Sequence, residues 1–298
     1  MTLNEVLDGW RPGTVTTTRR VDPWSAAAFA DLIGAPPPGL RTGDPLPPLW
    51  HWFTLLEHPA TTAIGVDGHP GSGPFLPPIP GRRRMFAGGR LRLDKPIPIG
   101  KELTGTSRVT QTKVKTGRSG EMVFVTVRTE LSADGVAAGA EEQDIVYRSE
   151  PEGAVRRKLE RQETGEPEPA GDWRLSTATD PVLLFRFSAL TYNGHRIHYD
   201  KPYVTETEGY PDLVVHGPLL ALLALELPRR HAPDRLVKSF EYRLVRPAFV
   251  PARIVSAAQP AQPAQPAQPP APGGSSEVDI VVAASGAAPS VTAKATLA

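Results

Sequence analysis

The stretch YRLVRPAFVPARIVS at residues 242–256 repeats an earlier stretch of the same chain, LRLDKPIPIGKELTG at residues 91–105. The two stretches are offset by 242 − 91 = 151 residues. Identical residues meet at three places in this alignment: Arg92 with Arg243, Leu93 with Leu244, and Pro96 with Pro247. Because internal similarity at a fixed offset indicates a repeated structural unit, we expect two halves with the same fold.

The segments before each copy contain the same pair of expected helices. The short helices are expected at 22–34 and 181–193, and the longer apolar helices at 49–65 and 216–227. Asp22 and Pro23 are typical of the cap and first turn of a helix, and Pro218 suits the first turn of the last one. Each half therefore has one short helix followed by one apolar helix.

Strands rich in β-branched residues are expected after each copy. They lie at 121–131 and 136–148 in the first half and at 277–285 and 290–298 in the second half. Long antiparallel strands around an apolar helix are an α+β arrangement. We predict two antiparallel sheets, each wrapped around a central helix, that pair edge to edge and so remove exposed strand edges.

Two segments fall outside the repeat. Residues 151–175 are charged and contain prolines, and they are predicted to link an N-terminal domain at 1–150 to a C-terminal domain at 176–298. Residues 258–276 are rich in proline and alanine, and we expect a surface loop there that interrupts two strands of the second half.

Composition excludes several classes of protein. The chain of 298 residues has 33 basic and 32 acidic residues, which offers no basic surface for nucleic acid. It has no cysteine, so disulfides, thiolate metal sites and cysteine nucleophiles are excluded. No apolar run is long enough to span a membrane, and the first residues do not resemble a secretory signal. We expect a cytoplasmic protein.

The second half carries a concentration of histidine that the first half lacks. Three of the seven histidines, His195, His198 and His216, lie within 187–230, beside an apolar helix. The corresponding stretch of the first half, APPPGLRTGDPLPP at 35–48, has no histidine. This asymmetry predicts one active site per chain, in the second half, which the first half could cover.

These residues occur in a recognisable order. N-x-H-x-x-H-x-D at 193–200 is followed by V-V-H-G-P-L-L at 214–220 and F-x-Y-R-L-V-R-P-A-F at 240–249. The order resembles the hydratase motif of the MaoC-like hydratases and dehydratases, and the first half is similar to their two-domain members. Those members include mesaconyl-C4-CoA and itaconyl-CoA hydratases and type 2 hydroxyacyl-thioester dehydratases. The resemblance implies a double hot-dog fold, with the first domain degenerate, and reversible addition of water to an enoyl thioester.

The resemblance also implies roles for single residues. It places His198 at the family's catalytic histidine and Asn193 where the family has a catalytic aspartate. Because an amide orients groups by hydrogen bonds but does not transfer protons, we assign proton transfer to His198 alone. His195 takes the place of the motif asparagine, and we expect it to contact substrate. No metal and no redox cofactor is required for this reaction.

The start of the apolar helix offers a site for developing negative charge. Gly217 can present its backbone N–H there, where the helix dipole is positive, to the oxygen of an enolate-like thioester. His216 is expected to brace this turn or line the pocket. His69, in the first half, is expected to be a loop residue that could touch the acyl pocket.

The run Arg82, Arg83 and Arg84 has two interpretations. Guanidinium groups bind carboxylates and phosphates, so the run could hold a substrate anion, or it could be a solvated strand end. A dicarboxylic substrate such as 3-methylfumaryl-CoA (mesaconyl-C4-CoA) would need one such cation. A metal site made by His195, His198 and Asp200 is less favoured than acid–base work, and Asp200 is expected to be structural.

Several functions are compatible with these residues. The first is hydration of a short branched or dicarboxylic enoyl-CoA, and the second is a 3-hydroxyacyl-thioester dehydratase of fatty-acid or polyketide synthesis. A thioesterase and a non-catalytic acyl-thioester-binding subunit are the third and the fourth. The expected partner is an acyl-CoA or acyl-carrier thioester, and the chain could form a homodimer.

Overall fold

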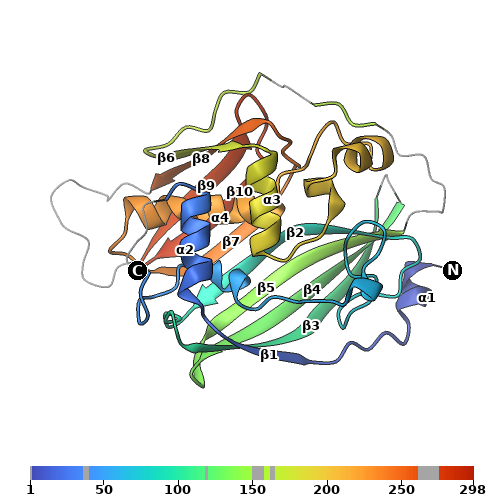
Figure 1. Cartoon of the computed structure of the whole chain (residues 1–298), viewed down its shortest axis with the longest axis horizontal. Helices are drawn as coiled ribbons and strands as arrows, with labels where there is room; N and C mark the ends of the chain where they lie inside the picture. Colours follow the sequence, from blue (N-terminus) through green and yellow to red (C-terminus); the bar gives the residue numbers. More distant parts are fainter. Residues whose placement is uncertain (1, 36–39, 118–119, 150–157, 162–164, 261–274) are drawn as a thin grey trace.

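One antiparallel sheet forms the frame of the molecule. The computed structural model describes residues 2–35, 40–117, 120–149, 158–161, 165–260 and 275–298. Within them, ten strands follow the order β1-β3-β4-β5-β2-β7-β10-β9-β8-β6 (Figure 1). The strands are β1 (Val15–Arg20), β2 (Arg82–Leu93), β3 (Glu102–Gly117), β4 (Gly120–Ala133), β5 (Val136–Ser149), β6 (Trp173–Thr179), β7 (Val237–Leu244), β8 (Ala252–Pro260), β9 (Ser276–Ala284) and β10 (Val291–Leu297).

The two halves of the sheet are copies of each other. Strands β1 to β5 of the first half correspond in order to β6, β7, β8, β9 and β10, and the sheet order is symmetric about the junction between β2 and β7. Matching backbone contacts also occur in the two halves. The Leu46 N–H donates to the Ile97 carbonyl at 2.7 Å, and the Val215 N–H donates to the Ala248 carbonyl at 2.8 Å; the two acceptors keep the offset, 248 − 97 = 151, whereas the two donors are 215 − 46 = 169 residues apart. The predicted repeat and edge-to-edge pairing are confirmed.

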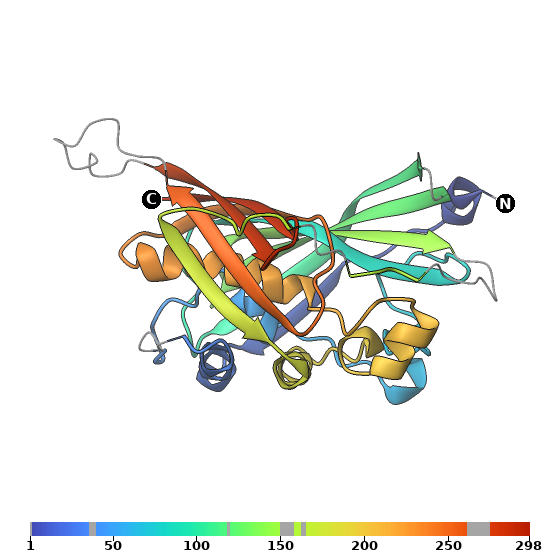
Figure 2. The same cartoon turned by 90° about the horizontal axis from the view of Figure 1, so that it is seen from above.

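Two short helices lie side by side on one side of the sheet. They are α2 (Pro23–Leu32) and α3 (Pro181–Leu190), and Figures 1 and 2 show them next to each other. An aspartate caps each helix and a proline follows it: the Asp22 carboxylate accepts from the Trp24 N–H at 2.9 Å, as the sequence predicts, and that of Asp180 accepts from the Leu183 N–H at 2.7 Å.

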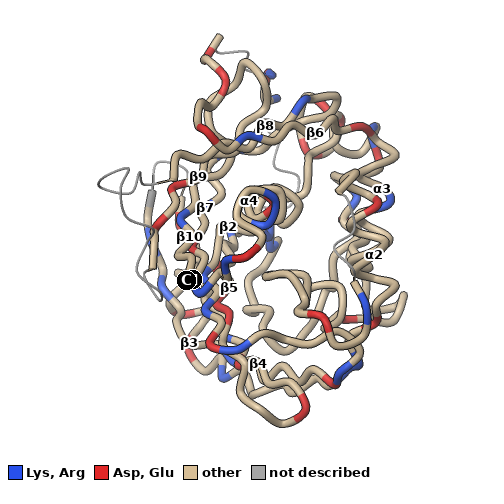
Figure 3. Tube along the Cα trace, turned by 90° about the vertical axis from the view of Figure 1, so that its left-hand side faces the viewer, with Lys and Arg blue, Asp and Glu red and all other residues tan. Residues whose placement is uncertain are grey.

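The core is built around α4 (Gly217–His231). All ten residues from Leu219 to Pro228 are buried, and α4 packs against β2 and against all five strands of the second half. Figure 3 shows this helix end-on in the middle of the molecule, with α2 and α3 across from the strands. Because it is apolar on every side, the helix is stable only where it is enclosed.

The helix predicted at 49–65 is not formed. This stretch contains only two short 3₁₀ helices, η1 (Trp50–Phe53) and η2 (Thr61–Ala63). Leu49 has a φ of 67°, outside the helical region, and Pro59 disfavours helical backbone at the residue before it. The aromatic side chains of η1 instead pack onto α2, with the rings of Trp50 and Phe53 5.0 and 4.7 Å from that of Phe29.

The two segments predicted as linker and loop are only partly described. β6 begins at Trp173, so the end of the predicted 151–175 linker belongs to the sheet, while 150–157 and 162–164 lie outside the described residues. β8 extends to Pro260 and β9 begins at Ser276, and residues 261–274 of the predicted Pro/Ala-rich loop also lie outside them.

The remaining elements are the N-terminal helix α1 (Leu3–Leu7), which contacts β4, and two short helices after α3, η3 (Arg196–His198) and η4 (Tyr203–Thr207). Among the described helices, none combines the length and the apolar character that crossing a membrane requires.

Truncating a side chain of α4 should destabilise both halves at once. We expect Leu222→Ala, at a fully buried position, to lower the free energy of unfolding by about 2–5 kcal/mol, because it leaves a cavity in the shared core. Urea denaturation followed by circular dichroism measures this loss. Val182→Ala on the exposed side of α3 is the control and should change stability by less than about 0.5 kcal/mol. Two separate transitions, with only one shifted, would contradict a shared core.

Candidate active site

His198 is held in one orientation by the backbone. It ends the short helix η3 (Arg196–His198) after α3, and its Nδ1 lies 2.7 Å from the Val214 carbonyl oxygen. A carbonyl only accepts, so the proton of the neutral ring sits on Nδ1 and leaves Nε2 as the acceptor. Burial lowers the pKa of His198 to about 4, so the ring is neutral near pH 7 and Nε2 is available as a base.

His216 lies directly against His198. The two rings stack with centroids 3.6 Å apart, and the Nε2 of His216 is 2.9 Å from the Ser188 hydroxyl oxygen. Both His216 and Ser188 are buried, and burial lowers the pKa of His216 well below its usual value. His216 therefore packs against the face of the His198 ring, a contact that the sequence did not predict, and the two roles expected for it stay predictions.

Gly217 begins α4 immediately after His216. A Cβ atom at this position would lie 2.5 Å from a methyl group of Leu244, so a larger residue here would require the Leu244 side chain to move. No hydrogen bond to the Gly217 N–H is found in the described part of the chain. This donor, at the positive end of a 15-residue helix, is thus available to a ligand.

Asn193 shapes the turn that carries the histidines. Its side-chain oxygen accepts from the His195 N–H at 3.0 Å, and its own N–H donates to the Ser188 carbonyl at 2.8 Å. Asn193 therefore positions His195 through the backbone. The His195 ring lies edge-on to that of His198, with centroids 5.5 Å apart.

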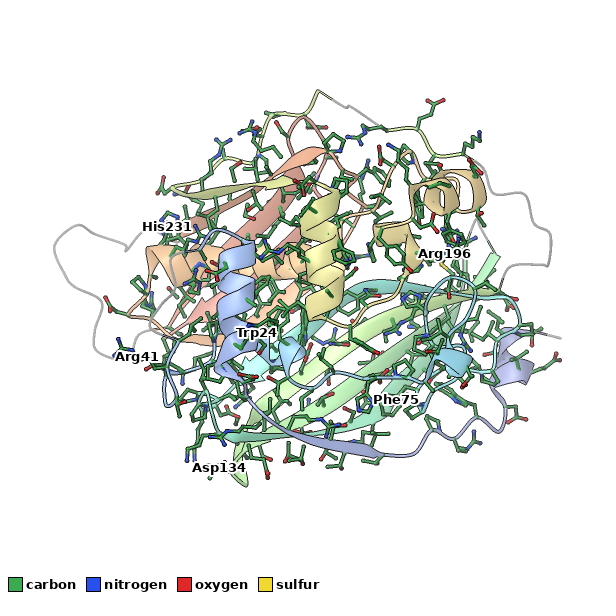
Figure 4. All side chains as sticks on the ribbon, viewed as in Figure 1. Trp24, Arg41, Phe75, Asp134, Arg196 and His231 are labelled. Carbon is green, nitrogen blue, oxygen red and sulfur yellow. The ribbon has the colours of Figure 1, made fainter. Side chains whose placement is uncertain are left out.

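A loop of the first half, residues 65–70, lies on this turn. The Arg196 N–H donates to the Asp67 carbonyl at 2.9 Å, and the Arg196 guanidinium donates to the Val66 carbonyl at 3.0 Å. Gly68 has a φ of 86°, and a Cβ atom there would lie 1.8 Å from the Gly194 carbonyl oxygen. Figure 4 labels Arg196, which lies where this loop meets the segment after α3. The two halves are thus joined tightly at the site.

This contact brings a fourth imidazole into the site. The rings of His69 and His195 are 3.8 Å apart, so His69, His195, His198 and His216 form a row. We call these four residues the imidazole row. Burial lowers the pKa of every ring in it, so the row is uncharged near neutral pH. His69 lies in a loop, as expected, and its contact with an acyl group stays a prediction.

One end of the row could hold a metal ion. Asp67, His69 and His195 each have a ligand atom within 4.8 Å of the others. The metal site that the sequence suggested, with less support than acid–base chemistry, had Asp200 as a ligand. In the structure the Asp200 carboxylate is paired with Arg196 at 2.8 Å and accepts from the Tyr203 N–H at 3.1 Å. Asp200 is therefore structural, as expected. The positive charge of Arg84 lowers the pKa of both His69 and His195 after burial, and it would also oppose a bound cation.

The three arginines of β2 have different surroundings. Arg82 donates to the carbonyls of Pro77 and Gly71, each at 2.8 Å. Arg83 donates to the Tyr210 hydroxyl and pairs with the Glu208 carboxylate, each at 3.0 Å. In the described part of the chain, Arg84 has neither a hydrogen bond nor an ion pair through its side chain. It is therefore the arginine of this run that is free to bind an anion.

Sequence reasoning missed a buried polar cluster in the first half. His51 lies 2.6 Å from one oxygen of Glu141, and the Trp52 indole N–H and the Gln143 amide donate to the other at 2.8 and 2.9 Å. The sequence offered one signal, an acidic residue at a core-facing position of the strand predicted at 136–148. It offered none for Val214 or Ser188, whose roles depend on tertiary contacts.

Comparisons with known proteins show which family the chain is similar to. The family model described as hydroxyacyl-thioester dehydratase type 2 matches residues 49–250. A mesaconyl-C(4)-CoA hydratase from Chloroflexus aurantiacus is 43% identical over 258 residues, which are 86% of this chain and 89% of that protein.

Solved structures agree on the fold. A MaoC-like dehydratase from Phytophthora capsici superposes with a TM-score of 0.63 at 16% identity, over 100% of this chain and 99% of its own. A Mycobacterium tuberculosis protein described as having a double hot-dog fold superposes with a TM-score of 0.55 at 16% identity, over 98% of this chain and 97% of its own. These likenesses confirm the predicted double hot-dog fold.

The buried neutral His198 should make stability depend on pH. In the unfolded state the His198 ring binds a proton near pH 6.5, whereas in the folded state it does so only near pH 4. The contribution of His198 to the free energy of unfolding is therefore fully present above about pH 6.5 and is lost as the pH falls toward 4. We expect His198 to account for a loss of about 2 kcal/mol between pH 7 and pH 5. Urea denaturation at the two pH values measures it. His198→Gln should reduce the pH dependence by that amount, whereas the exposed His231→Gln should not; equal slopes in all three proteins would contradict the assignment.

Proposed function

The chain belongs to the hydroxyacyl-thioester dehydratase type 2 family, and on this premise we propose that it hydrates 3-methylfumaryl-CoA (mesaconyl-C4-CoA) or a similar short dicarboxylic enoyl-CoA. It is a hydro-lyase, an enzyme that adds or removes water at a double bond beside a thioester. The observation that supports this reaction is a pair of groups, a base and a hydrogen-bond donor. The base is His198, whose proton is fixed on Nδ1, and the donor is the Gly217 N–H, which follows the stacked His216 and has no partner among the described residues.

The reaction needs one proton transfer in each direction. The Nε2 of His198 takes a proton from water, and the water oxygen forms a bond to the β-carbon. The π electrons of the double bond move to the α-carbon and the thioester carbonyl, whose oxygen becomes negative. His198 then returns its proton to the α-carbon. All atoms of water end on the product, on the same face of the double bond, and the enzyme is unchanged.

The negative oxygen of the intermediate requires a donor that is in place beforehand. The Gly217 N–H supplies it at the start of α4, where the helix dipole adds to the hydrogen bond. Asn193 acts in this scheme through the His195 backbone, because its side-chain oxygen already accepts that N–H and an amide does not carry protons.

The guanidinium of Arg84, which has no hydrogen bond or ion pair with any described residue, supports a dicarboxylic substrate. In 3-methylfumaryl-CoA the second carboxylate is attached to the β-carbon, the atom that water attacks, so the carboxylate must lie close to the catalytic imidazole. Arg84 lies near enough to the imidazole row to lower the pKa of His69 and His195. A charge-assisted hydrogen bond between Arg84 and this carboxylate would hold the substrate in the required orientation.

The second candidate is a 3-hydroxyacyl-thioester dehydratase of fatty-acid or polyketide synthesis. The family match favours it, since loss of water is the same reaction in reverse. An aliphatic acyl chain would leave Arg84 without a counter-ion, which is why we rank this candidate second. The cytoplasmic location, the homodimer and the division into domains at 1–150 and 176–298 stay predictions.

The activity itself is tested by following absorbance of the enoyl-thioester band. Purified protein should remove the band of 3-methylfumaryl-CoA fastest among a panel with crotonyl-CoA, itaconyl-CoA and a longer enoyl-CoA. His198→Ala should lower kcat by about 100-fold or more, because it removes the only base proposed to transfer the proton. A folded wild-type protein that binds thioesters without turnover would instead support the non-catalytic binding subunit, and release of free CoA would support a thioesterase.

The carboxylate contact is tested by Arg84→Met. We expect kcat/KM for 3-methylfumaryl-CoA to fall about 10- to 100-fold, the effect of losing one charged hydrogen bond. The value for crotonyl-CoA, which has no second carboxylate, should change no more than about threefold. Arg186→Met, on the exposed side of α3, is the control. Equal losses for both substrates would remove Arg84 from carboxylate recognition.

A further inference from the structure

The reaction above gives no role to the imidazole of His69. His69 belongs to the first half, and its ring contacts His195 at 3.8 Å between centroids. Its charge would lower the pKa of His198, which means that the two rings lie close enough to interact. Because the loop at 65–70 is hydrogen-bonded to the backbone of Arg196, His69 is held in this position.

A carboxylate orients His69 in the way that a carbonyl orients His198. The Nδ1 of His69 lies 3.3 Å from the Asp67 carboxylate, whose other oxygen accepts the His69 N–H at 3.0 Å. Burial raises the pKa of Asp67, but its contacts with His69 outweigh burial and keep that pKa below its usual value, so Asp67 is ionised. An ionised carboxylate accepts the Nδ1 proton, which leaves the Nε2 of His69 as an acceptor.

The carboxylates of Asp200 and Glu208, which could also orient an imidazole of the row, already have partners. Asp200 is paired with Arg196, and Glu208 accepts from the Tyr203 hydroxyl at 3.0 Å and pairs with Arg83. His195 has no carboxylate on its ring in the described part of the chain. Among the described residues, only Asp67 thus joins a carboxylate to an imidazole of the row.

We propose that His69, oriented by Asp67, accepts a hydrogen bond from the reacting water, while His198 takes the other hydrogen of that water as a proton. A water molecule held by one acceptor can rotate, whereas two acceptors direct an oxygen lone pair at the β-carbon. The hydrogen that points at His69 stays covalently bonded to the water oxygen and becomes the hydrogen of the product hydroxyl. The proton on His198 goes to the α-carbon, so no proton is gained or lost. The first half therefore contributes a catalytic residue to the second.

The inference rests on the hydration proposed above but not on the identity of the acyl group. All variants are compared on the thioester that the wild type converts fastest, so a wrong acyl group changes the substrate and leaves the comparison intact. His69→Ala should lower kcat about 100-fold with KM changed less than about threefold. His58→Ala, an exposed histidine of the first half, is the matched control and should keep wild-type kinetics.

Two further measurements separate catalysis from a structural role. Added imidazole should restore part of the kcat of His69→Ala, which a loss of loop structure would not allow. Asp67→Asn keeps an oxygen for the His69 N–H but removes the charge. It should lower kcat about 10-fold and move the acid limb of the kcat/KM profile to lower pH, because Asp67 raises the pKa of His69.

Burial and three neighbouring groups set the pKa of His69. Burial lowers this pKa most, the contact with Asp67 raises it, the charge of Arg84 lowers it, and the charge of Glu208 raises it. Wild-type kcat and an unchanged pH profile in both His69→Ala and Asp67→Asn would overturn the proposal. Loss of activity on treatment with a chelator, restored by zinc, would also overturn it in favour of a metal at Asp67, His69 and His195. We expect no effect of the chelator. If His69→Ala does not fold, Asp67→Asn decides.

Discussion

The antiparallel pairing of β2 with β7 is the contact on which the rest of the structure depends. It joins two copies of one unit into a single sheet, with Gly88 opposite Arg243 and Gly89 opposite Tyr242. The register leaves no room for side chains at these glycines, since a Cβ atom at Gly88 would lie 2.4 Å from the Tyr242 carbonyl oxygen. With the halves fixed in this way, the loop at 65–70 lies on the turn that carries His195 and His198. The site is therefore composite, although most of its residues come from one half.

The same pairing explains why two similar halves make one site. The matching contacts of Leu46 and Val215 place Pro47 opposite His216 and Pro48 opposite Gly217 in the repeat. Proline has no N–H, so the first half cannot offer the backbone donor that Gly217 supplies. It has also lost its central helix, and α4 is enclosed by strands of both halves. Without a donor and a helix start, the first half is left to contribute a covering loop, a free arginine and a histidine.

Burial determines the electrostatics of the site more than any single ion pair does. The four imidazoles are packed so closely that protonating one disfavours protonation of the next, and burial alone already lowers their pKa values. A neutral row suits a reaction in which a proton is taken from water and returned to carbon. The one nearby charge without a partner in the described residues, that of Arg84, can then act on an anionic substrate without competition from a protonated histidine.

The sequence by itself determined the repeat, the α+β class and the cap of α2, because these depend on local patterns and on spacing, and it singled out residues 193–217 as candidates for the second-half part of the site. Its prediction of a helix at 49–65 was wrong, since apolar spacing there resembles that of α4 and only the packing of Trp50 and Phe53 onto α2 shows the difference. Only the tertiary structure decided which arginine is free, that Val214 sets the tautomer of His198, and that Asp67 and His69 belong to the site. Some of these features depend on contacts between segments more than 100 residues apart, such as that of His69 with His195. Others depend on a partner that no sequence motif marks, such as the backbone carbonyl that contacts His198.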